Sequence, residues 1–230
     1  MTGTTIVEVR DVTRRYTQGR VTVDALRGLD LDLQSGEFTA ICGPSGSGKT
    51  TLLNLIGALD RPTSGTIRLE GHELGEMSRR ERSHLRRDRI GFVFQAYNLM
   101  PVLTAYENAE IVLALQGVPA AERKARVVKL LDDVGLAGLE DRRPDELSGG
   151  QQQRVAIARA IASEPAIVLA DEPTANVDSE TAETLLDLMQ RLNRERGVTF
   201  LFSTHDPRVM ARAGRVIRIV DGRVETDERH

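Results

Sequence analysis

The stretch GPSGSGKT, residues 43–50, decides how the rest of this sequence is interpreted. It follows a short apolar run, EFTAICG, and opens a stretch with leucines at helical spacing, TTLLNLIGAL. A glycine-rich turn between a buried strand and a helix lets backbone N–H groups converge on phosphate, at the positive end of the helix. We therefore predict a nucleotide phosphate-binding loop formed by Gly43, Pro44, Ser45, Gly46, Ser47, Gly48, Lys49, Thr50 and Thr51.

A phosphate-binding loop also needs charged and metal-binding partners. Lys49 is placed to neutralise the β- and γ-phosphate oxygens, and the Thr50 hydroxyl to bind Mg²⁺. Asp171 ends a second apolar run, AIVLAD, and is the candidate carboxylate for the metal. Glu172 follows it directly. A second carboxylate beside Mg²⁺ is a candidate general base for water attacking the γ-phosphate, and the alternative is a solvent-facing acid that ends a strand.

The pattern of expected strands and helices changes twice along the chain. Short strand patterns with glycine-rich turns fill the first part, as far as IGFVFQ, residues 90–95. Three helical stretches follow without any strand pattern, and alternating strands and helices then resume at AIVLAD. We predict an α/β core with a parallel sheet over 1–95 and 165–230, interrupted by a helical subdomain over 96–164. In the second of those helices we expect four core residues at helical spacing: Val127, Val128, Leu131 and Val134.

A second glycine-rich helix start lies far downstream, in ELSGGQQQRVAIARA, residues 146–160. Its leading residues Ser148, Gly149, Gly150 and Gln151 have the same chemistry as the first loop, with small residues and free amides at a helix N-terminus. One nucleotide needs only one such loop. The residues alone leave open which phosphate the second one holds.

Composition excludes several classes of protein. Hydrophobic residues make up 40% and charged residues 28%, ordinary values for a globular protein, and the formal net charge is -3. This charge provides no overall field for nucleic acid or an anionic membrane. The arginine-rich run SRRERSHLRRDR, residues 78–89, carries interspersed acids and no aromatics, so we interpret it as a solvated helix face and expect no nucleic acid partner.

Cysteine content and hydropathy bear on location. The single cysteine, Cys42, excludes an internal disulfide and fits a reducing compartment, where we expect it to be packing. We find neither a signal-peptide pattern nor about 18 uninterrupted apolar residues, so we expect a cytoplasmic protein that does not itself span a membrane.

Three motifs in this order, GPSGSGKT, LSGGQQQR and LADEPTANVD, resemble the Walker A, signature and Walker B motifs of the ATP-binding-cassette (ABC) ATPases. The resemblance covers essentially the whole chain and implies a single ABC ATPase domain over 1–230. It also implies a P-loop NTPase fold: a RecA-like parallel sheet, an N-terminal antiparallel β part and an inserted helical subdomain. ATP and Mg²⁺ are the implied cofactors, and ATP hydrolysis is the implied activity.

The resemblance implies roles for four further residues. Tyr16 matches the aromatic that stacks on adenine, a contact indifferent to the identity of the base. Gln95 resembles the glutamine that contacts Mg²⁺ and the attacking water and reports the nucleotide state to the helical subdomain. His205 looks like the histidine that contacts the γ-phosphate, and Asp178 like the acid that reaches across a dimer. For Tyr16, a core tyrosine is the alternative.

The sequence departs from the family pattern at Ala175 and Val177, where similar proteins often have glycine and leucine. This departure affects the expected geometry of one loop and none of the predicted catalytic positions.

The resemblance also implies what the second loop binds. In this family two chains pair head to tail, so that the signature of one chain closes over the ATP held by the other. Ser148, Gly149, Gly150 and Gln151 would then contact the γ-phosphate of the partner's ATP, and the chain would be a homodimer in the ATP state.

Two loop segments, GALDRPTSG and FVFQAYNLMPVLTAYENAE, resemble the branch that serves macrolide-export, lipoprotein-release and cell-division permeases. The resemblance implies a separate membrane permease that docks near residues 97–101, between Tyr97 and Pro101, with Leu99 and Met100 facing it. The chain would lie on the inner face of the cytoplasmic membrane as a peripheral protein.

Three other readings remain open at this point. The structural alternative to docking for residues 97–101 is a packed loop that joins the two subdomains. The permease partner could belong to a transmembrane signalling complex of the cell-division type instead of a transporter. A P-loop kinase or a DNA-associated ABC ATPase would share the phosphate-binding loop, but the first has no use for LSGGQ and the second usually carries long coiled coils or zinc modules between the motifs.

Overall fold

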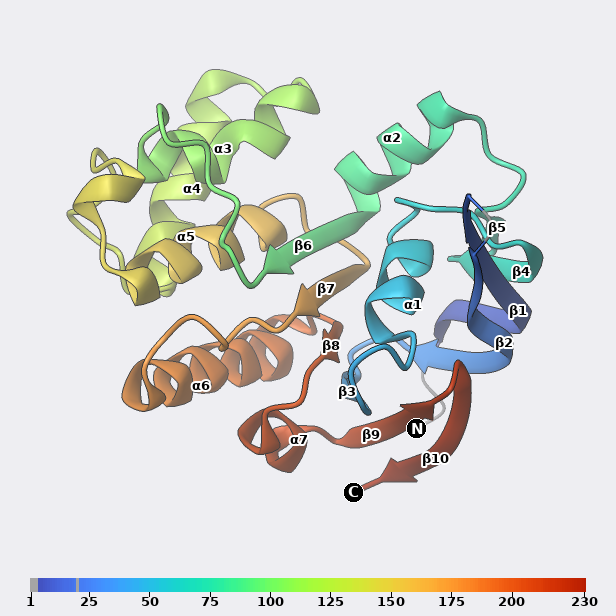
Figure 1. Ribbon diagram of the computed structural model, residues 1–230. Coiled ribbons are helices and arrows are strands. Elements are labelled where there is room, and N and C mark those ends of the chain that lie inside the picture. The colour runs from blue at the N-terminus through green and yellow to red at the C-terminus, as the bar shows by residue number, and fades with distance from the viewer. Residues whose placement is uncertain (1–3, 20) are drawn as a thin grey trace.

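Figure 1 shows the computed structural model of the chain, which describes residues 4–19 and 21–230. Residues 1–3 and 20 belong to the core segment predicted from the sequence and lie outside the described residues. Two sheets with helices packed around them make up the described part (Figure 1).

The central sheet has six strands in the order β10-β9-β3-β8-β7-β6. Five of them, β9, β3, β8, β7 and β6, run parallel, and β10 pairs antiparallel with β9. Their bounds are β3 (Phe38–Cys42), β6 (Ile90–Phe94), β7 (Ile167–Asp171), β8 (Phe200–Ser203), β9 (Arg215–Val220) and β10 (Arg223–Arg229). Because the strands are parallel, the residues that follow β3, β6, β7 and β8 meet at one edge of the sheet.

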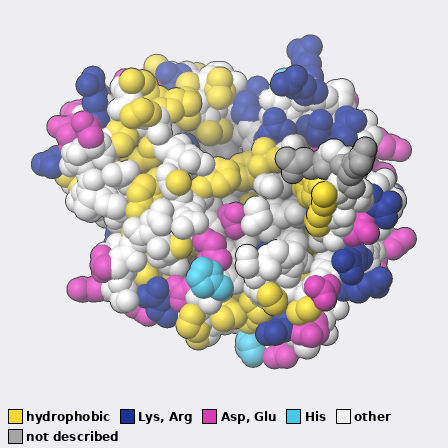
Figure 2. All heavy atoms as spheres, viewed as in Figure 1, with side chains coloured by type: hydrophobic (Ala, Val, Ile, Leu, Met, Phe, Trp, Pro, Cys, Tyr) yellow, Lys and Arg dark blue, Asp and Glu magenta, His cyan; other side chains and the backbone are white. Residues whose placement is uncertain are grey.

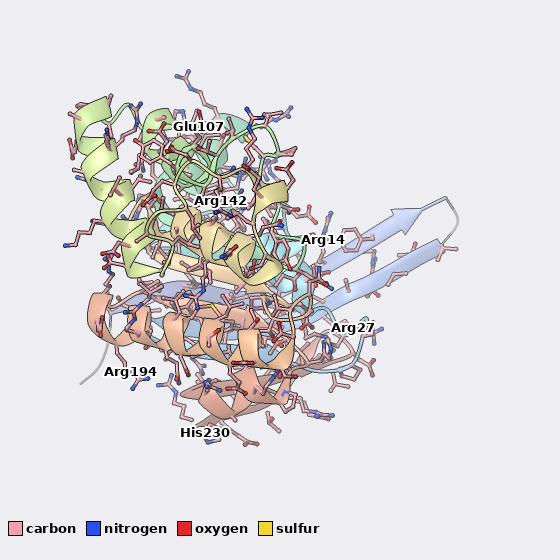
Figure 3. All side chains as sticks on the ribbon, turned by 90° about the vertical axis from the view of Figure 1, so that its left-hand side faces the viewer. Arg14, Arg27, Glu107, Arg142, Arg194 and His230 are labelled. Carbon is pink, nitrogen blue, oxygen red and sulfur yellow. The ribbon has the colours of Figure 1, made fainter. Side chains whose placement is uncertain are left out.

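The second sheet is antiparallel, as expected, and has the order β2-β1-β4-β5. Its strands are β1 (Thr5–Gln18), β2 (Val21–Gln34), β4 (Ser64–Leu69) and β5 (His72–Glu73). The paired strands β1 and β2 extend well beyond the body of the molecule (Figure 3). Near their base, the alternating leucines of β2 turn inward, and Leu26, Leu29, Leu31 and Leu33 are buried.

The helices are α1 (Lys49–Ile56), α2 (Arg79–Arg89), α3 (Ala105–Leu115), α4 (Ala120–Asp133), α5 (Gly149–Ile161), α6 (Ser179–Arg196) and α7 (Pro207–Arg212), with a short 3₁₀ turn η1 (Pro144–Glu146). Capping boxes begin α2, α3 and α5, where Ser78, Thr104 and Ser148 each accept a hydrogen bond from the backbone three residues on. The arginine-rich helix α2 buries only Leu85. Only helices connect β6 to β7, and we propose this stretch as the helical subdomain.

Two apolar clusters lie on opposite faces of the parallel sheet, because successive strand residues point to opposite faces. On one face, Ala40 and Phe202 pack with α3, α4, α5 and α6. On the other, Ile41 and Leu201 pack with α1 and the antiparallel sheet. The helical stretch therefore shares a core with the sheet instead of forming one of its own.

One of the four expected core residues of α4 is not in the core. Val127, Leu131 and Val134 are buried, but Val128 is exposed, and Leu130 is buried in its place. The prediction for Val128 was wrong because the buried residues 127, 130, 131 and 134 follow the i, i+3, i+4, i+7 spacing of one helix face, and residue 128 lies outside that face.

Gly91 brings strand β6 against helix α5. A Cβ at this position would lie 2.2 Å from the backbone oxygen of Ala160. We expect Gly91→Ala to lower the free energy of unfolding by about 1–3 kcal/mol, because the strand and helix must separate. Equilibrium urea unfolding measures this, with Gly75→Ala as the matched control, since a Cβ at Gly75 meets nothing within 4 Å. Equal midpoints for the two variants would contradict the close approach.

Candidate functional site

A cleft of about 750 Å³ lies at the edge where the parallel strands end. It gathers most of the predicted site from distant parts of the sequence: β1 and β2, the glycine-rich loop, and the residues after β6, β7 and β8. Its lining consists of Tyr16, Val23, Ala25, Gly43, Ser45, Gly46, Gly48, Lys49, Thr50, Thr51, Gln95, Asp171, Glu172, Ser203 and His205.

The glycine-rich loop has a backbone that only glycine adopts readily. Gly48 is the N-cap of α1 with φ 105°, and a Cβ at Gly43 would lie 2.0 Å from the carbonyl oxygen of Ile219. The Lys49 ammonium donates to the carbonyls of Gly43 and Pro44, at 2.9 Å each, and so stays at the mouth of the loop. The first-turn amides of α1 and one cation thus face the same space, which suits a polyphosphate.

The Thr50 hydroxyl lies 3.4 Å from both carboxylate oxygens of Asp171. A hydroxyl and a carboxylate are the hard oxygen ligands that Mg²⁺ binds, usually together with phosphate oxygens and water. Thr50 lies in the first turn of α1 and Asp171 ends β7, so a helix and a strand position this pair. The donor set therefore fits Mg²⁺ at the position predicted from the sequence.

Glu172 occupies a strained position between two strand ends. Its φ is 46°, a left-handed conformation that costs a non-glycine residue about 1–2 kcal/mol. Its amide donates to Ser203 O at 2.9 Å, and its carboxylate accepts from the Thr204 hydroxyl at 3.2 Å and lies 2.6 Å from His205 Nδ1. Such strain persists where neighbouring structure over-determines it, and it is common at functional sites.

A second carboxylate, Asp206, holds together the loops that carry Glu172 and His205. Asp206 is the N-cap of α7 and accepts a hydrogen bond from the Thr174 hydroxyl at 2.9 Å. Hydrogen bonds from Arg208 lower the pKa of Asp206 to about 2, so it stays ionised at neutral pH. It thereby ties the chain after Glu172 to the chain after His205.

Tyr16 lies on β1 with its ring partly exposed. Its hydroxyl donates to Asp60 at 2.9 Å, and the Arg14 guanidinium, which pairs with the same carboxylate, lies 4.4 Å from the ring centroid. Arg14 is labelled on this strand in Figure 3. The aromatic therefore has a fixed orientation at one end of the cleft and is not a core residue, which removes the alternative left open by the sequence.

Gln95 is joined to a residue that the sequence did not single out, Asn176. The Gln95 side chain donates to Asn176 Oδ1 at 3.1 Å, and the Asn176 side chain donates back to Gln95 O at 3.0 Å. Asn176 lies in the second half of the Walker B-like segment LADEPTANVD, after the end of β7, so this reciprocal pair links the ends of β6 and β7. Only the polar character of the loop TANVD hinted at it.

Two buried hydroxyls at the site, those of Ser47 and Ser203, have no hydrogen-bond partner among the described residues. Ser203 lines the cleft and was not predicted; the signal was the polar pair Ser203-Thr204 that ends the apolar run FLF. Ser47 is a buried residue of the loop itself. Pro44 and Ser47 are the two predicted loop residues that do not line the cleft.

A sequence model of the ABC transporter family matches residues 26–175. The chain belongs to the ABC transporter family. It is 49% identical over 224 residues to an uncharacterised ABC transporter ATP-binding protein of Thermotoga maritima, covering 97% of this chain and 95% of the other. It is 47% identical over 228 residues to the lipoprotein-releasing system ATP-binding protein LolD of Anaeromyxobacter dehalogenans, with 99% and 95% covered.

Two further similarities extend the comparison. The macrolide export ATP-binding/permease protein MacB of Paracoccus denitrificans is 46% identical over 228 residues, and this chain spans 34% of its length. Among solved structures, the dimeric, post-hydrolysis ATP-binding cassette MJ0796 of Methanocaldococcus jannaschii, bound to ADP and Pi, superimposes with a TM-score of 0.89. It is 43% identical, with 97% of this chain and 98% of that chain covered.

These comparisons confirm three predictions: the ABC family, the P-loop NTPase fold and the ATPase activity. The individual residue roles stay predictions, supported by the geometry of the cleft.

The ABC signature residues lie outside the cleft of their own chain. Ser148 is exposed and caps α5, its hydroxyl accepting from the Gln151 amide at 3.3 Å. Gly149 and Gly150 are packed closely, because a Cβ on either would meet Tyr97 or Thr181 within 3 Å. The structure therefore does not bring Ser148, Gly149, Gly150 and Gln151 to the phosphate-binding loop of the same chain.

Asp178 has a local role in the ABC ATPase that the sequence did not predict. It is the N-cap of α6, accepting from the amide and hydroxyl of Thr181 at 2.9 and 2.6 Å. These bonds lower the pKa of Asp178. Its predicted contact across a dimer stays a prediction.

The residues expected to dock a permease differ in how exposed their side chains are. Leu99 packs against the larger apolar cluster and is half-buried, so part of its side chain serves packing, and its predicted contact with a permease stays a prediction. Met100 is 47% exposed and Val102 is 73% exposed. Hydrophobic side chains also gather over the nearby helical part around α3 (Figure 2).

We expect Tyr16→Ala to weaken ATP binding by about five-fold to a hundred-fold, since stacking on a base contributes roughly 1–3 kcal/mol. Tyr16→Phe keeps the ring and loses only the bond to Asp60, so it should bind nearly as well as the native chain. Isothermal titration with ATP and with GTP measures both variants, and the loss should be similar for the two bases. An unchanged affinity for Tyr16→Ala would mean that the ring does not contact the base.

Proposed function

We propose that this ABC ATPase binds ATP with Mg²⁺, works as a homodimer around two ATP molecules and drives a separate membrane permease of the macrolide-export or lipoprotein-release type. One observation carries the proposal: the cleft unites every predicted hydrolytic residue of one chain, yet excludes the signature of that same chain. Each cleft therefore lacks one wall, which a second copy can supply.

The residues of the cleft divide the work of hydrolysis. Lys49 and the amides of the glycine-rich loop would neutralise the phosphate chain, with Thr50, Asp171 and Gln95 holding Mg²⁺, which stabilises the developing charge. Glu172 would accept the proton of the attacking water. His205, 76% exposed at its side chain and 2.6 Å from Glu172, would orient that carboxylate and reach the γ-phosphate.

The free start of α5 supports the dimer. Ser148 is exposed at this end of the helix, so the positive helix end lies at the surface of a chain whose phosphate-binding loop is elsewhere. A two-fold pairing of identical chains makes two complete sites from two incomplete ones. The MJ0796 cassette, similar over nearly its whole length, is dimeric.

The membrane partner is supported by the names of relatives and by one exposed loop. LolD belongs to a lipoprotein-releasing system, and MacB joins an ATP-binding part to a permease in one chain. None of the helices in the described residues is both long and apolar enough to cross a membrane. We propose that the chain lies at the inner face of the cytoplasmic membrane and docks its permease through residues 97–101, with exposed Met100 and the adjacent Val102 as contacts.

The role of Glu172 provides the test of the proposed function. We expect Glu172→Gln to bind ATP but hydrolyse it at least about a hundred-fold more slowly, because the general base is lost while the phosphate contacts remain. Size-exclusion chromatography should show an ATP-dependent dimer that holds two nucleotides. Lys49→Ala, which removes the phosphate cation, is the control and should neither bind tightly nor dimerise. Hydrolysis near the native rate in Glu172→Gln would exclude Glu172 as the base.

Mixed dimers test whether the signature acts on the partner's nucleotide. We combine a Lys49→Ala chain with a Ser148→Asp chain, since aspartate caps a helix as well as serine but repels phosphate. If Ser148 serves the partner, both defects fall in one site and the other site is intact, so purified mixed dimers should occlude one ATP. If Ser148 serves its own chain, both sites are defective, and the mixed dimer should occlude no more ATP than either homodimer.

A further inference from the structure

The loop that follows Gln95 contains two consecutive residues in a conformation that L-amino acids rarely adopt. Tyr97 has φ 59° and Asn98 has φ 51°, and neither is glycine. The Asn98 amide turns back onto Ala96 O at 2.5 Å. A left-handed pair of this kind persists only where surrounding contacts hold it, so the loop depends on what it touches.

Arg159, on α5, contacts both strained residues. Its two terminal guanidinium nitrogens donate to Tyr97 O at 2.9 Å and Asn98 O at 2.6 Å. Both of these contacts of Arg159 are to carbonyls and not to a carboxylate, and burial lowers the pKa of its guanidinium. A planar guanidinium can bridge two successive carbonyls that both point to one side, whereas a lysine ammonium has a single nitrogen for them.

The side chain of Tyr97 reaches the other end of the same helix. Its hydroxyl donates to Asn176 O at 2.9 Å and lies 2.8 Å from where a Cβ of Gly149 would be. Tyr97 therefore lies alongside α5, with its backbone bound to Arg159 and its hydroxyl beside the first residue of the helix. Asn176 in turn pairs with Gln95 in the nucleotide cleft.

We propose that Arg159 is a positioning residue that latches the strained Tyr97-Asn98 turn to the signature helix α5, so that the loop and the start of the helix move together. The proposal rests on the proposed function in one respect, that the partner's ATP engages the start of α5 and a permease engages this loop. The latch would couple ATP binding at the start of α5 to permease binding at the loop.

Coupling between two sites is reciprocal for binding. If a permease that displaces the loop alters the ATP site through Arg159, then ATP that engages the signature must alter the loop through the same contact. The latch can therefore be tested with ATP alone, in the chain as it is.

The experiment measures amide hydrogen exchange by mass spectrometry in the Glu172→Gln background, with and without ATP and Mg²⁺. Two peptides matter, one over 147–153 at the start of α5 and one over 96–103 in the loop. With Arg159 present, ATP should slow exchange in the first peptide and change exchange in the second. With Arg159→Met, the first response should remain, while loop exchange should rise at least about ten-fold and no longer depend on ATP.

The matched control is Arg154→Met. Arg154 also lies on α5, is also partly buried and donates to a carbonyl, that of Val134, but it does not contact the loop. It should leave both ATP responses as in the background chain. A loop that responds to ATP equally in the Arg159 and Arg154 variants would overturn the latch.

Two more variants keep the outcome clear. If Arg159→Met does not fold, Arg159→Lys retains the cation and can bind only one carbonyl at a time, and it should weaken the loop response; an unchanged response would overturn the latch. Tyr97→Phe removes only the bond to Asn176. It should also reduce the ATP-dependent change in hydrogen exchange of the loop peptide. If ATP fails to slow exchange in 147–153 even in the Glu172→Gln chain, the proposed dimer is contradicted. If ATP slows exchange there and the loop peptide of Arg159→Met still behaves as in the Glu172→Gln chain, only the latch is contradicted.

Discussion

The carboxyl ends of β3, β6, β7 and β8 must meet at one edge of the sheet, and the rest of the structure depends on this constraint. Parallel pairing at β3-β8, β8-β7 and β7-β6 carries four unrelated segments to a single cleft. Each strand contributes what its end can hold: amides and a cation after β3, an amide side chain after β6, two carboxylates at β7, and hydroxyls with an imidazole after β8. The two apolar clusters, one on each face, pack against the same strands and so hold their ends in place.

The sequence predicted those parts of the site that lie at strand ends and in compact motifs. Gly43 to Thr51, Asp171 and Glu172 could be found because an apolar run stops where a functional residue begins. Asn176 could not be found this way, since its pairing with Gln95 depends on how two distant loops approach. Val128 shows the opposite failure, because apolar identity alone does not place a residue on the buried face of a helix.

The signature could be located in the sequence, but its job could not be derived from one chain. Ser148 caps α5 through its side chain, a purely structural use that any well-formed helix start shares. The only structural sign of a further role is that Ser148 does not line the cleft of its own chain. A site that needs two copies leaves each copy with an exposed helix end and an open cleft, and the family resemblance supplied the link between them.

Helix α5 connects these features, because its contacts are divided along its length. Its first turn presents Ser148 outward and packs Gly150 against α6, its middle buries Gln153, which donates to Pro173 O at 2.6 Å, and its last turns hold Ala160 against Gly91 of β6. A rigid helix that touches β6, the segment after β7 and the loop after Gln95 cannot shift at one end without moving all three. Close packing without room at Gly91 and Gly150 makes such movement a displacement of the whole helix and not a local bend, which is the property that a coupling element requires.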